Sequence, residues 1–312
     1  MHCSAERWMR FQTTDNHTQL LTLNVPMIHR FCITHKTPLL PQSWYDDCIA
    51  LGDFQTDSAL HVKQLDRFWH EARPLAYSSA GTCVLPIAIK RFCSAADRIE
   101  ISSYRKRILP SPEGVESQIY PTMRELSPIS GGQAEVAILA RTTDLEFLVS
   151  QPLYFKQSII GQYEEAHHRR DILDYTSLAI ETGVLDSKSA WEFLDAKHFI
   201  PGGVEQGIYP RAWLVDALSK IERVGRLFLE RHSRRLVKYD DYQIRAVGFL
   251  SERLGSYFLL RHFNEKYSNN IPNEIFGYMS VVVDNNSGYS AGLTDRPANR
   301  PRSYPLKVKR AP

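Results

Sequence analysis

The alternation of strand-like and helix-like segments is the feature that most limits the fold of this 312-residue chain. Short segments in which apolar and polar residues alternate, such as residues 98–103 (RIEISS), are separated by longer segments with apolar residues three and four positions apart. Strands that are separated by helices favour a layered fold in which the sheet is largely parallel. The sequence therefore predicts an α/β fold with a mostly parallel sheet flanked by helices.

The expected elements can be placed along the chain. Strands are expected over residues 28–34, 98–103, 134–140, 145–149 and 278–283. Helices are expected over 57–72, 84–92, 158–170, 172–181, 186–193, 210–228 and 241–263. Pro86 suits a first helical turn, where its missing N–H costs nothing, and Asp186 suits an N-cap. The Pro-, Ser- and Gly-rich residues 109–133 predict a long mobile loop.

The two ends of the chain differ in composition from the middle. Residues 1–27 are polar and irregular and are expected to be a variable extension, followed by one domain over 28–294. Residues 295–312 carry six Lys and Arg against one Asp, and four prolines, which predicts a disordered basic tail. Two interpretations of this tail remain open, a solvated segment and a weak contact with an anionic membrane surface.

Charge and cysteine usage limit the class of protein. The net charge is +3, and the basic tail accounts for more than all of it, so a nucleic-acid partner is not expected. Five cysteines without a CxxC pair predict reduced thiols rather than a zinc site or a disulfide framework. The first residues lack the apolar run of a signal peptide, and no apolar run is long enough to span a membrane. We therefore expect a cytoplasmic protein. If the basic tail binds lipid, the protein would also contact the inner face of the membrane.

The segment 241–263 carries the most specific pattern. Asp241, Arg245, Gly248, Glu252 and Gly255 recur at steps of three and four, so a helix would place them on one face. Each glycine costs a helix roughly 1 kcal/mol relative to alanine, so this face is expected to allow close approach by a backbone or a ligand. A surface ladder of charges with glycines packed on a neighbouring helix is the alternative.

Two strand ends carry residues suited to an anionic ligand, because open α/β sheets bind ligands beyond the carboxyl ends of their strands. Tyr104, Arg105 and Arg107 follow or adjoin the strand 98–103, together with Lys106. Arg and Lys suit phosphate oxygens, and Tyr can stack on a base or a sugar. Thr34, His35 and Lys36 end the first strand. A solvated basic turn and a structural His remain the alternatives.

Two further groups are weaker candidates. His168 shares a helical face with Glu164 and Asp171, a set suited to acid–base chemistry or a metal, although capping and surface contacts explain it equally well. The turn Pro201-Gly202-Gly203, before Gly207, can bring backbone amides close to an anion or a sugar, and a plain tight turn is the alternative. The sequence lacks GxGxxG, GxxxxGK[ST], HExxH and GxSxG, the commonest dinucleotide, P-loop, metalloprotease and hydrolase motifs.

Taken in order, these segments resemble a bacterial family of exopolysaccharide or capsular-polysaccharide glycosyltransferases. The matching stretches are Thr34-His35-Lys36, Tyr104-Arg105-Lys106, Gln162-Tyr163 with His167 or His168, and Gln243-Ile244-Arg245 through Gly248–Leu254. The resemblance covers roughly residues 28–265. Ser103 stands where the family often has His, Lys106 replaces an Arg, and residues 51–80 match poorly.

The resemblance implies a Rossmann-like single domain of the GT-A type and the transfer of a sugar from a nucleotide-sugar donor to a saccharide or lipid-linked acceptor. Thr34, His35 and Lys36 would contact the nucleotide, and Tyr104, Arg105 and Arg107 would bind the diphosphate or the acceptor. Gln243 and Arg245 would position the sugar. Asp241 or Glu252 would be the base or a metal ligand, with His168 in reserve.

The leaving diphosphate needs stabilisation by a metal or by cationic side chains. Many GT-A enzymes hold a divalent cation with Asp-x-Asp, which this sequence lacks. We therefore expect cations to hold the diphosphate and leave the metal undetermined. A non-catalytic scaffold with a degenerate transferase fold and, more distantly, a phosphoryl or nucleotidyl transferase are the alternatives.

Overall fold

The computed structural model describes residues 27–55, 60–117, 123–127, 133–142, 144–268 and 270–283. The expected basic tail over 295–312 and, apart from Met27, the expected N-terminal extension lie outside these ranges. Most of the expected mobile loop at 109–133 is divided between short strands and residues outside the described ranges.

A nine-stranded sheet forms the centre of the molecule, in the order β2-β1-β3-β4-β11-β6-β5, with β10 beside β3 and β7 beside β11. The strands are β1 (Ile28–Thr34), β2 (Asp47–Ala50), β3 (Arg98–Ser103), β4 (Lys106–Leu109), β5 (Val115–Glu116), β6 (Met123–Leu126), β7 (Val149–Ser150), β10 (Gly207–Pro210) and β11 (Phe276–Val282). β8 (Leu153–Tyr154) and β9 (His198–Phe199) form a separate antiparallel pair.

Most of the central strands run in one direction. β1 pairs in parallel with β2 and β3, and β11 pairs in parallel with β6 and β7. β4 is antiparallel to both β3 and β11, so β3 and β11 run in the same direction. Only β4, β5 and β10, of the strands in this sheet, run the other way. The expected α/β fold with a mostly parallel sheet flanked by helices is confirmed.

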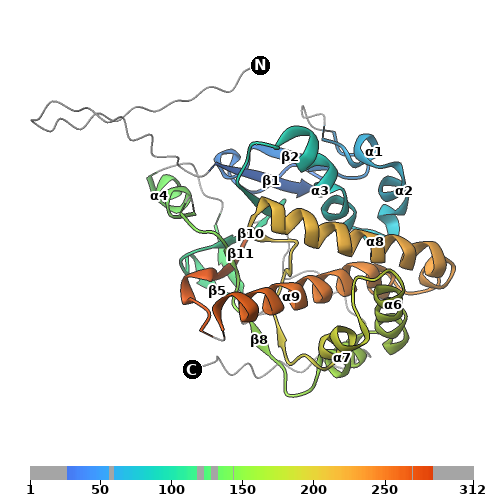
Figure 1. Cartoon of the computed structure of the whole chain (residues 1–312). Helices are drawn as coiled ribbons and strands as arrows, with labels where there is room; N and C mark the ends of the chain where they lie inside the picture. The colour runs from blue at the N-terminus through green and yellow to red at the C-terminus, as the bar shows by residue number, and fades with distance from the viewer. Residues whose placement is uncertain are drawn as a thin grey trace, which may run out of the picture.

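The helices cover the sheet, and two long ones lie side by side across the molecule (Figure 1). They are α8 (Arg211–Leu236) and α9 (Ala246–Tyr267). The others are α1 (Val62–Leu65), α2 (Arg67–Ala76), α3 (Ser79–Phe92), α4 (Gln133–Thr142), α5 (Ile159–Ala166), α6 (Arg169–Glu181) and α7 (Ser187–Asp195), with 3-10 turns η1 (Gln42–Trp44), η2 (Gln243–Arg245) and η3 (Asn273–Ile275). None of the helices in the described ranges is long and apolar enough to cross a bilayer.

The core follows from the periodicity of these helices. α8 buries Leu214, Leu218, Ile221 and Phe228, which recur at steps of three, four and seven and therefore lie on one face. This face packs into the same hydrophobic core as the buried residues of β1, β3 and α9. The core fixes α3, α8 and α9 against the sheet, and these elements position the cavity described below.

Several boundaries differ from the prediction. Residues 134–140 form helix α4 rather than a strand: Val136 is 68% exposed and Ile138 is buried, as positions two apart on a helix require and positions on one face of a strand do not. The helix expected from Val84 begins at Ser79, which places Pro86 inside it. The helix expected over 57–72 is divided at Asp66, whose side chain accepts a hydrogen bond from Phe68 N and caps α2.

The helix expected from Asp241 begins five residues later, at Ala246. Asp240 is the physical cause, because its Oδ1 accepts hydrogen bonds from the backbone N–H of Tyr242 (2.9 Å) and Gln243 (2.8 Å). An Asp that bonds to the amides two and three residues later starts a new turn. Asp241 is therefore an exposed turn residue and does not share a helical face with Glu252.

Candidate functional site

A cavity of about 340 Å³ opens at the carboxyl ends of the parallel strands β1, β2 and β3. Ile33, Leu51 and Ser102 line it from these strand ends, and Ser103 completes that wall. The start of β4, the α2–α3 junction, the turn before β10 and η2 form the other walls. Ligands of open α/β sheets bind at such a place, so we call it the strand-end cavity and treat it as the candidate active site.

Backbone hydrogen bonds fix the two strand ends against each other. Tyr104 O accepts hydrogen bonds from the N–H of Leu39 (2.7 Å) and Leu40 (3.3 Å), and Tyr104 N donates to Ile33 O. The loop after β1 is therefore held on the two-residue turn between β3 and β4. The rings of His35 and Tyr104 meet edge to face, with centroids 5.1 Å apart, and both residues line the cavity.

Four cationic side chains converge on this cavity from separate elements: Arg73 from α2, Arg105 and Lys106 from the β3–β4 turn and the first residue of β4, and Arg245 from η2. Burial lowers the pKa of Lys106; Glu252 opposes this shift, and Arg105 and Arg245 add to it. The first turn of α3 also borders the cavity, and a helix N-terminus carries a partial positive charge. The cavity is therefore built to attract an anion.

The same cations act on His35. Burial lowers the pKa of this imidazole, and the charges of Arg73, Lys36 and Arg105 lower it further. Lys36 does not line the cavity; its Nζ lies 4.7 Å from the centroid of the Tyr104 ring. His35 is thus a neutral imidazole near pH 7, at the rim of a positive site.

Four polar atoms that face this cavity are buried and have no hydrogen-bond partner among the described residues: Arg73 Nε, Thr82 Oγ1, Gln206 Oε1 and Arg245 Nε. A buried polar atom without a partner costs about 1–3 kcal/mol, so native structures rarely retain several together. A polar ligand that bonds to them would recover this cost. Their convergence from α2, α3, η2 and the turn before β10 favours a ligand with several oxygen atoms.

Arg245 is held by aromatic rings. Its guanidinium carbon lies 5.2 Å from the ring centroid of Tyr77, 5.0 Å from that of Tyr242 and 5.6 Å from that of Phe249. Tyr77, between α2 and α3, has a φ of +50°, an uncommon value for a residue other than glycine, and lines the cavity. These contacts restrict Arg245 without neutralising its charge.

The turn before β10 contributes Glu205 and Gln206 to the cavity, and Glu252 of α9 holds this turn. Glu252 Oε1 accepts a hydrogen bond of 2.7 Å from Gly202 N. Gly203 has a φ of +48°, and a Cβ added to it would lie 2.5 Å from Glu252 O. Only glycine fits there, because the backbone of the turn touches the backbone of α9.

The helix glycines serve the same close packing. A Cβ on Gly255 would lie 3.0 Å from Val204 N, and one on Gly248 would lie 3.0 Å from Ser79 Oγ. The expected close approach by backbone is confirmed at Gly255, whose neighbour is the turn before β10, and Gly248 packs on the start of helix α3, as the alternative interpretation predicted.

Arg107 is placed away from the cavity. Its side chain is fully buried, its guanidinium bonds to both carboxylate oxygens of Glu100, and its cation lies 4.8 Å from the centre of the Trp44 ring. Successive residues of a strand face opposite sides, so Lys106 and Arg107 cannot both reach the cavity. The position of Arg107 supports a structural role instead of the predicted diphosphate contact.

Thr34 and Gln243 support the site from outside it. Thr34 is buried, and its Oγ1 accepts from Lys36 N and donates to Lys36 O, which closes the turn after β1. Gln243 Nε2 donates to Ala166 O (2.7 Å), and Gln243 Oε1 lies 3.1 Å from His167 Nδ1. These bonds tie η2, and thereby Arg245, to the end of α5.

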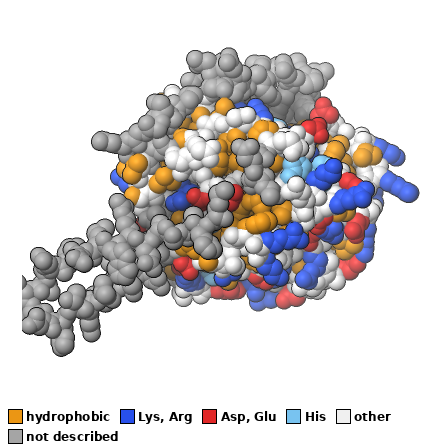
Figure 2. Space-filling view, turned by 90° about the horizontal axis from the view of Figure 1, so that it is seen from above, with side chains coloured by type: hydrophobic (Ala, Val, Ile, Leu, Met, Phe, Trp, Pro, Cys, Tyr) orange, Lys and Arg blue, Asp and Glu red, His pale blue; other side chains and the backbone are white. Residues whose placement is uncertain are grey.

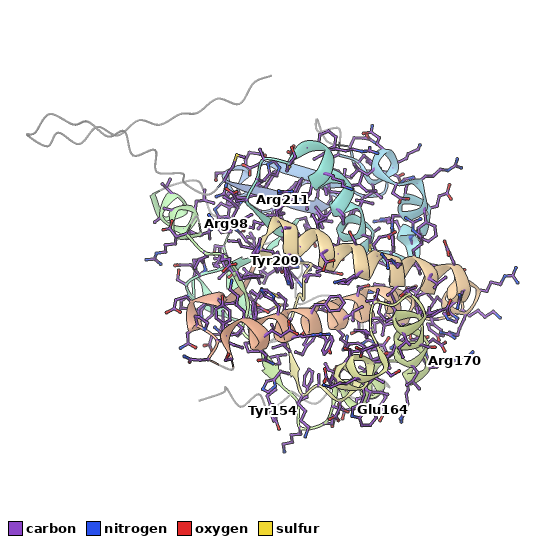
Figure 3. The ribbon with its side chains drawn as sticks, in the orientation of Figure 1. Arg98, Tyr154, Glu164, Arg170, Tyr209 and Arg211 are labelled. Atoms are coloured by element: carbon purple, nitrogen blue, oxygen red, sulfur yellow. The ribbon has the colours of Figure 1, made fainter. Side chains whose placement is uncertain are left out.

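His168 and its neighbours lie elsewhere. His168 is the exposed N-cap residue of α6, and its ring stacks near that of Tyr239. Asp171 is buried and bonds to Arg235 (2.7 Å), while Glu164 pairs with Arg169. In the view of Figure 3, Glu164 and Arg170 lie toward the lower right of the molecule and Arg98 toward the upper left. Ion pairs account for Asp171 and Glu164, and a ring contact with Tyr239 accounts for His168.

Several residues of the cavity were not singled out from the sequence, among them Tyr77, Thr82 and Gln206, and two of the missed residues are charged. Arg73 and Glu205 line the cavity from α2 and from the turn before β10. The glycines of that turn gave the signal for Glu205, since they allow it to approach other backbone. Arg73 gave no signal, because its segment resembles an ordinary amphipathic helix.

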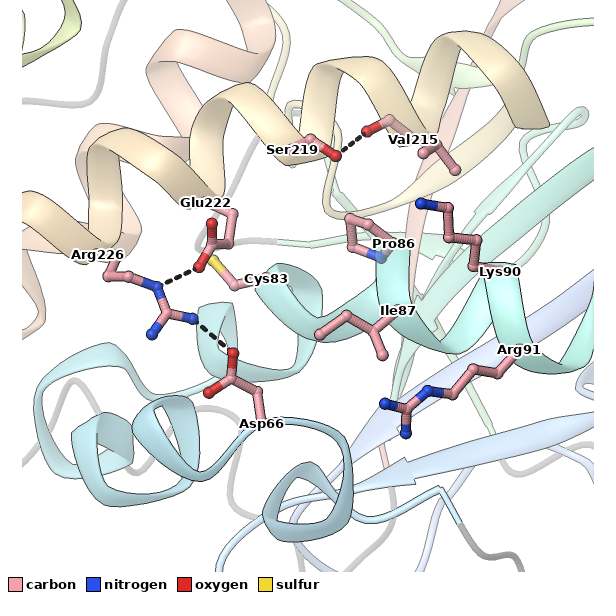
Figure 4. Close-up of a pocket in the computed structure, with 10 residues that line it drawn as sticks. All are labelled: Asp66, Cys83, Pro86, Ile87, Lys90, Arg91, Val215, Ser219, Glu222 and Arg226. Carbon is pink, nitrogen blue, oxygen red and sulfur yellow. Dashed lines mark hydrogen bonds and ion pairs between the residues drawn. The ribbon is translucent and has the colours of Figure 1, made fainter. Parts of the chain in front are cut away.

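Other surface features are less suited to a ligand. Lys and Arg side chains lie among Asp and Glu side chains on the face that Figure 2 shows from above. A hollow of about 500 Å³ between α3 and α8 is lined by Ile87 and Val215, and its Arg226 is already bonded to Glu222 and Asp66 (Figure 4). Arg226 of this hollow is paired with two carboxylates, whereas four cations and one carboxylate of the described residues line the strand-end cavity.

The metal-ligating side chains among the described residues do not favour a metal site. Among the described residues, no three His, Cys, Asp or Glu side chains form a group that could hold an ion. Glu205 is the one carboxylate that faces the cavity in this part of the chain, and its Oε1 accepts a hydrogen bond from Ser79. The side chains present fit an anion bound by cations.

Comparisons with known proteins bear on the fold. No family model and no curated protein matches the sequence. The structure is similar to the apo structure of the bifunctional glycosyltransferase WbbM, with a TM-score of 0.62 and 12% sequence identity. The match covers 83% of this chain and 46% of the WbbM chain, so this chain spans less than half the length of that protein. The likeness shows a glycosyltransferase-like fold.

Proposed function

We propose that this protein is a glycosyltransferase that moves a sugar from a nucleotide-sugar donor to a hydroxyl of a saccharide or lipid-linked acceptor, in the assembly of a surface polysaccharide. The observation that carries the proposal is the strand-end cavity, where four cations and four unpartnered polar atoms converge at the carboxyl ends of parallel strands. The glycosyltransferase-like fold supports the same activity.

In this proposal, the cations stabilise the diphosphate that leaves the sugar. The bond between the sugar and the diphosphate breaks with its electron pair on the diphosphate oxygen, which gains negative charge. Arg105, Lys106 and Arg245 surround the place where this charge would form, and fixed cations stabilise such charge strongly where water is excluded. A divalent cation would supply the same stabilisation, but the donor atoms described above do not form its site, so these side chains carry the role.

The aromatic residues at the rim suit the remainder of the donor. Tyr104 stands at the β3–β4 turn beside His35, and Tyr77 lines the cavity from the α2–α3 junction. Tyrosine rings stack on bases and sugar rings. The donor would thus lie with its phosphates at the centre of the cavity and its rings against the rim.

The test is a panel of nucleotide sugars, including UDP-glucose, UDP-galactose, UDP-N-acetylglucosamine and GDP-mannose. We expect one donor to raise the melting temperature, since a ligand that binds only the folded protein stabilises it, and the same donor to release nucleoside diphosphate on incubation. Indifference to every donor would refute the proposal. It would favour a non-catalytic scaffold with a transferase-like fold, which the missing Asp-x-Asp motif also suits.

A further inference from the structure

Glu205 is a carboxyl group in the strand-end cavity that the proposed function leaves without a role. It stands in the turn between Val204 and Gln206 and lines the cavity together with Lys106 and Arg245. Its Oε1 accepts a hydrogen bond of 2.8 Å from Ser79 Oγ, at the start of α3. This hydrogen bond orients the carboxyl group, and the side chain is only half-buried, so it can be reached from the cavity.

The backbone on both sides of Glu205 is fixed. Gly202 N bonds to Glu252, and Glu205 N donates to Gly202 O (2.7 Å). The hydroxyl oxygen of Tyr209 lies within hydrogen-bond distance of two carbonyl oxygens that share its single proton, Gly203 O (2.9 Å) and Gln206 O (2.6 Å). This bracing holds the Cα of Glu205 in place, and a precisely held side chain is what a catalytic group needs.

Resting on the glycosyltransferase activity proposed above, we propose that Glu205 is the general base of the transfer and that Glu252 is the positioning residue that holds it. The proton of the acceptor hydroxyl passes to a carboxylate oxygen of Glu205. The acceptor oxygen then bonds to the anomeric carbon, and the bond from that carbon to the diphosphate breaks with its electrons on the diphosphate. This assigns to Glu205 the role that the resemblance implied for Glu252 or Asp241.

The position of Glu252 supports this division. Its Oε1 is bonded to Gly202 N, and Glu252 does not line the cavity. It therefore acts on the reaction through the turn that carries Glu205. Asp241 lies in the turn before η2 and is exposed, outside the cavity lining.

The surroundings also tune Glu205 as a base. Burial and the charge of Glu252 raise the pKa of Glu205 to about 8, and the hydrogen bond from Ser79 opposes this shift. The other titratable or charged groups that face it or share its cavity are His35, Arg73, Tyr77, Cys83, Tyr104, Arg105, Lys106, Tyr175, Tyr209 and Arg245. A base whose pKa lies near the working pH is efficient, because it is strong and still partly ionised.

His35 is the competing base in the cavity. Burial and the cations around it lower its pKa, which makes it a weaker proton acceptor than Glu205. The two bases predict different acidic limbs in the pH profile: near pH 8 for Glu205, and below pH 6.5 for His35.

The test measures release of nucleoside diphosphate from the donor that the panel identifies, with water as the acceptor, so that the natural acceptor is not required. We expect Glu205→Gln to lower kcat by about 10²–10⁴-fold, the usual contribution of general acid–base catalysis, and to remove the acidic limb of kcat/KM near pH 8. Its affinity for the nucleoside diphosphate should stay within a few fold of wild type. Glu71→Gln, at an exposed site on α2, is the matched control and should behave as wild type.

Glu252→Gln separates positioning from proton transfer. The amide oxygen of Gln can still accept from Gly202 N, but the negative charge is gone, so we expect activity to persist and the acidic limb to move to lower pH.

A wild-type rate and pH profile in Glu205→Gln would overturn the inference while the glycosyltransferase activity stands. Loss of transfer in Glu252→Gln with no shift of the limb, while Glu205→Gln stays active, would restore Glu252 as the base. Absence of turnover with every donor in the wild-type protein would instead overturn the proposed function itself.

Discussion

The close contact between Gly203 and α9 makes Gly203→Ala the sharpest structural test of the site. The added methyl group would lie 2.5 Å from Glu252 O, a backbone atom that cannot rotate away, in a residue whose φ is +48°. Gly183→Ala is the matched control, because Gly183 has a φ of +69° and no atom within 4 Å of the added methyl group. The two changes share the left-handed backbone and differ in the contact.

The expected magnitudes follow from this difference. Gly183→Ala should lower the free energy of unfolding by roughly 1–2 kcal/mol, the cost of left-handed backbone in a residue with a Cβ. Gly203→Ala should lose about 1–3 kcal/mol more, the usual cost of forcing an extra carbon into close packing. Equilibrium unfolding in urea measures both. Equal losses in the two variants would refute the claim that the turn carrying Glu205 is pressed onto α9.

Two further predictions test other parts of the structure. Arg107→Met should lower the free energy of unfolding by about 3–5 kcal/mol in urea titrations, because it leaves Glu100 buried without its closest partner. The folded variant should keep wild-type affinity for nucleoside diphosphates. A selective loss of that affinity would return Arg107 to the binding site. Burial alone would lower the pKa of His29, but Asp47, at 3.0 Å, and Cys93 raise it to about 9. His29 therefore contributes stability that is fully present below pH 6.5 and is lost as the pH rises through 9. His29→Gln should flatten this part of the stability profile, and an unchanged profile would contradict the ion pair.

The sequence was most informative where the determinants are local. The strands 28–34 and 98–103 match β1 and β3 at both ends, and Asp186 caps α7 through its bond to Ser189 N, as expected. Local alternation also misled, since Val136 and Ile138 gave α4 the appearance of a strand. Asp240 started a new turn where helical spacing alone predicted one continuous helix.

The site could be predicted only in part, because its members meet through tertiary packing. His35, Tyr104, Arg105 and Arg245 were proposed from strand ends and helical spacing, and all four line the cavity. Their predicted roles remain predictions. The alternation of a strand could have separated Lys106 from Arg107, since neighbouring residues face opposite sides.

Glu205 and Arg73 illustrate the part that the sequence could not supply. Neither stands at a strand end or on a patterned helical face. Their places in the cavity depend on how the turn before β10 packs on α9 and how α2 packs beside η2. The glycines mark the turn before β10 in the sequence, but the contacts that bring Glu205 and Arg73 to the cavity join residues far apart in the chain and have no local signature.

The affinity of the Arg245→Ala protein for the nucleoside diphosphate of its donor tests the central claim most directly, because Arg245 brings a charge and an unpartnered buried Nε into the strand-end cavity. Hydrogen bonds to charged groups contribute about 1.5–3 kcal/mol, so calorimetric titration should show a Kd roughly 10- to 100-fold weaker than that of wild type. Arg67→Ala, at an exposed position of α2, should bind as wild type does. Equal affinity in all three proteins would contradict the placement of the diphosphate among these cations.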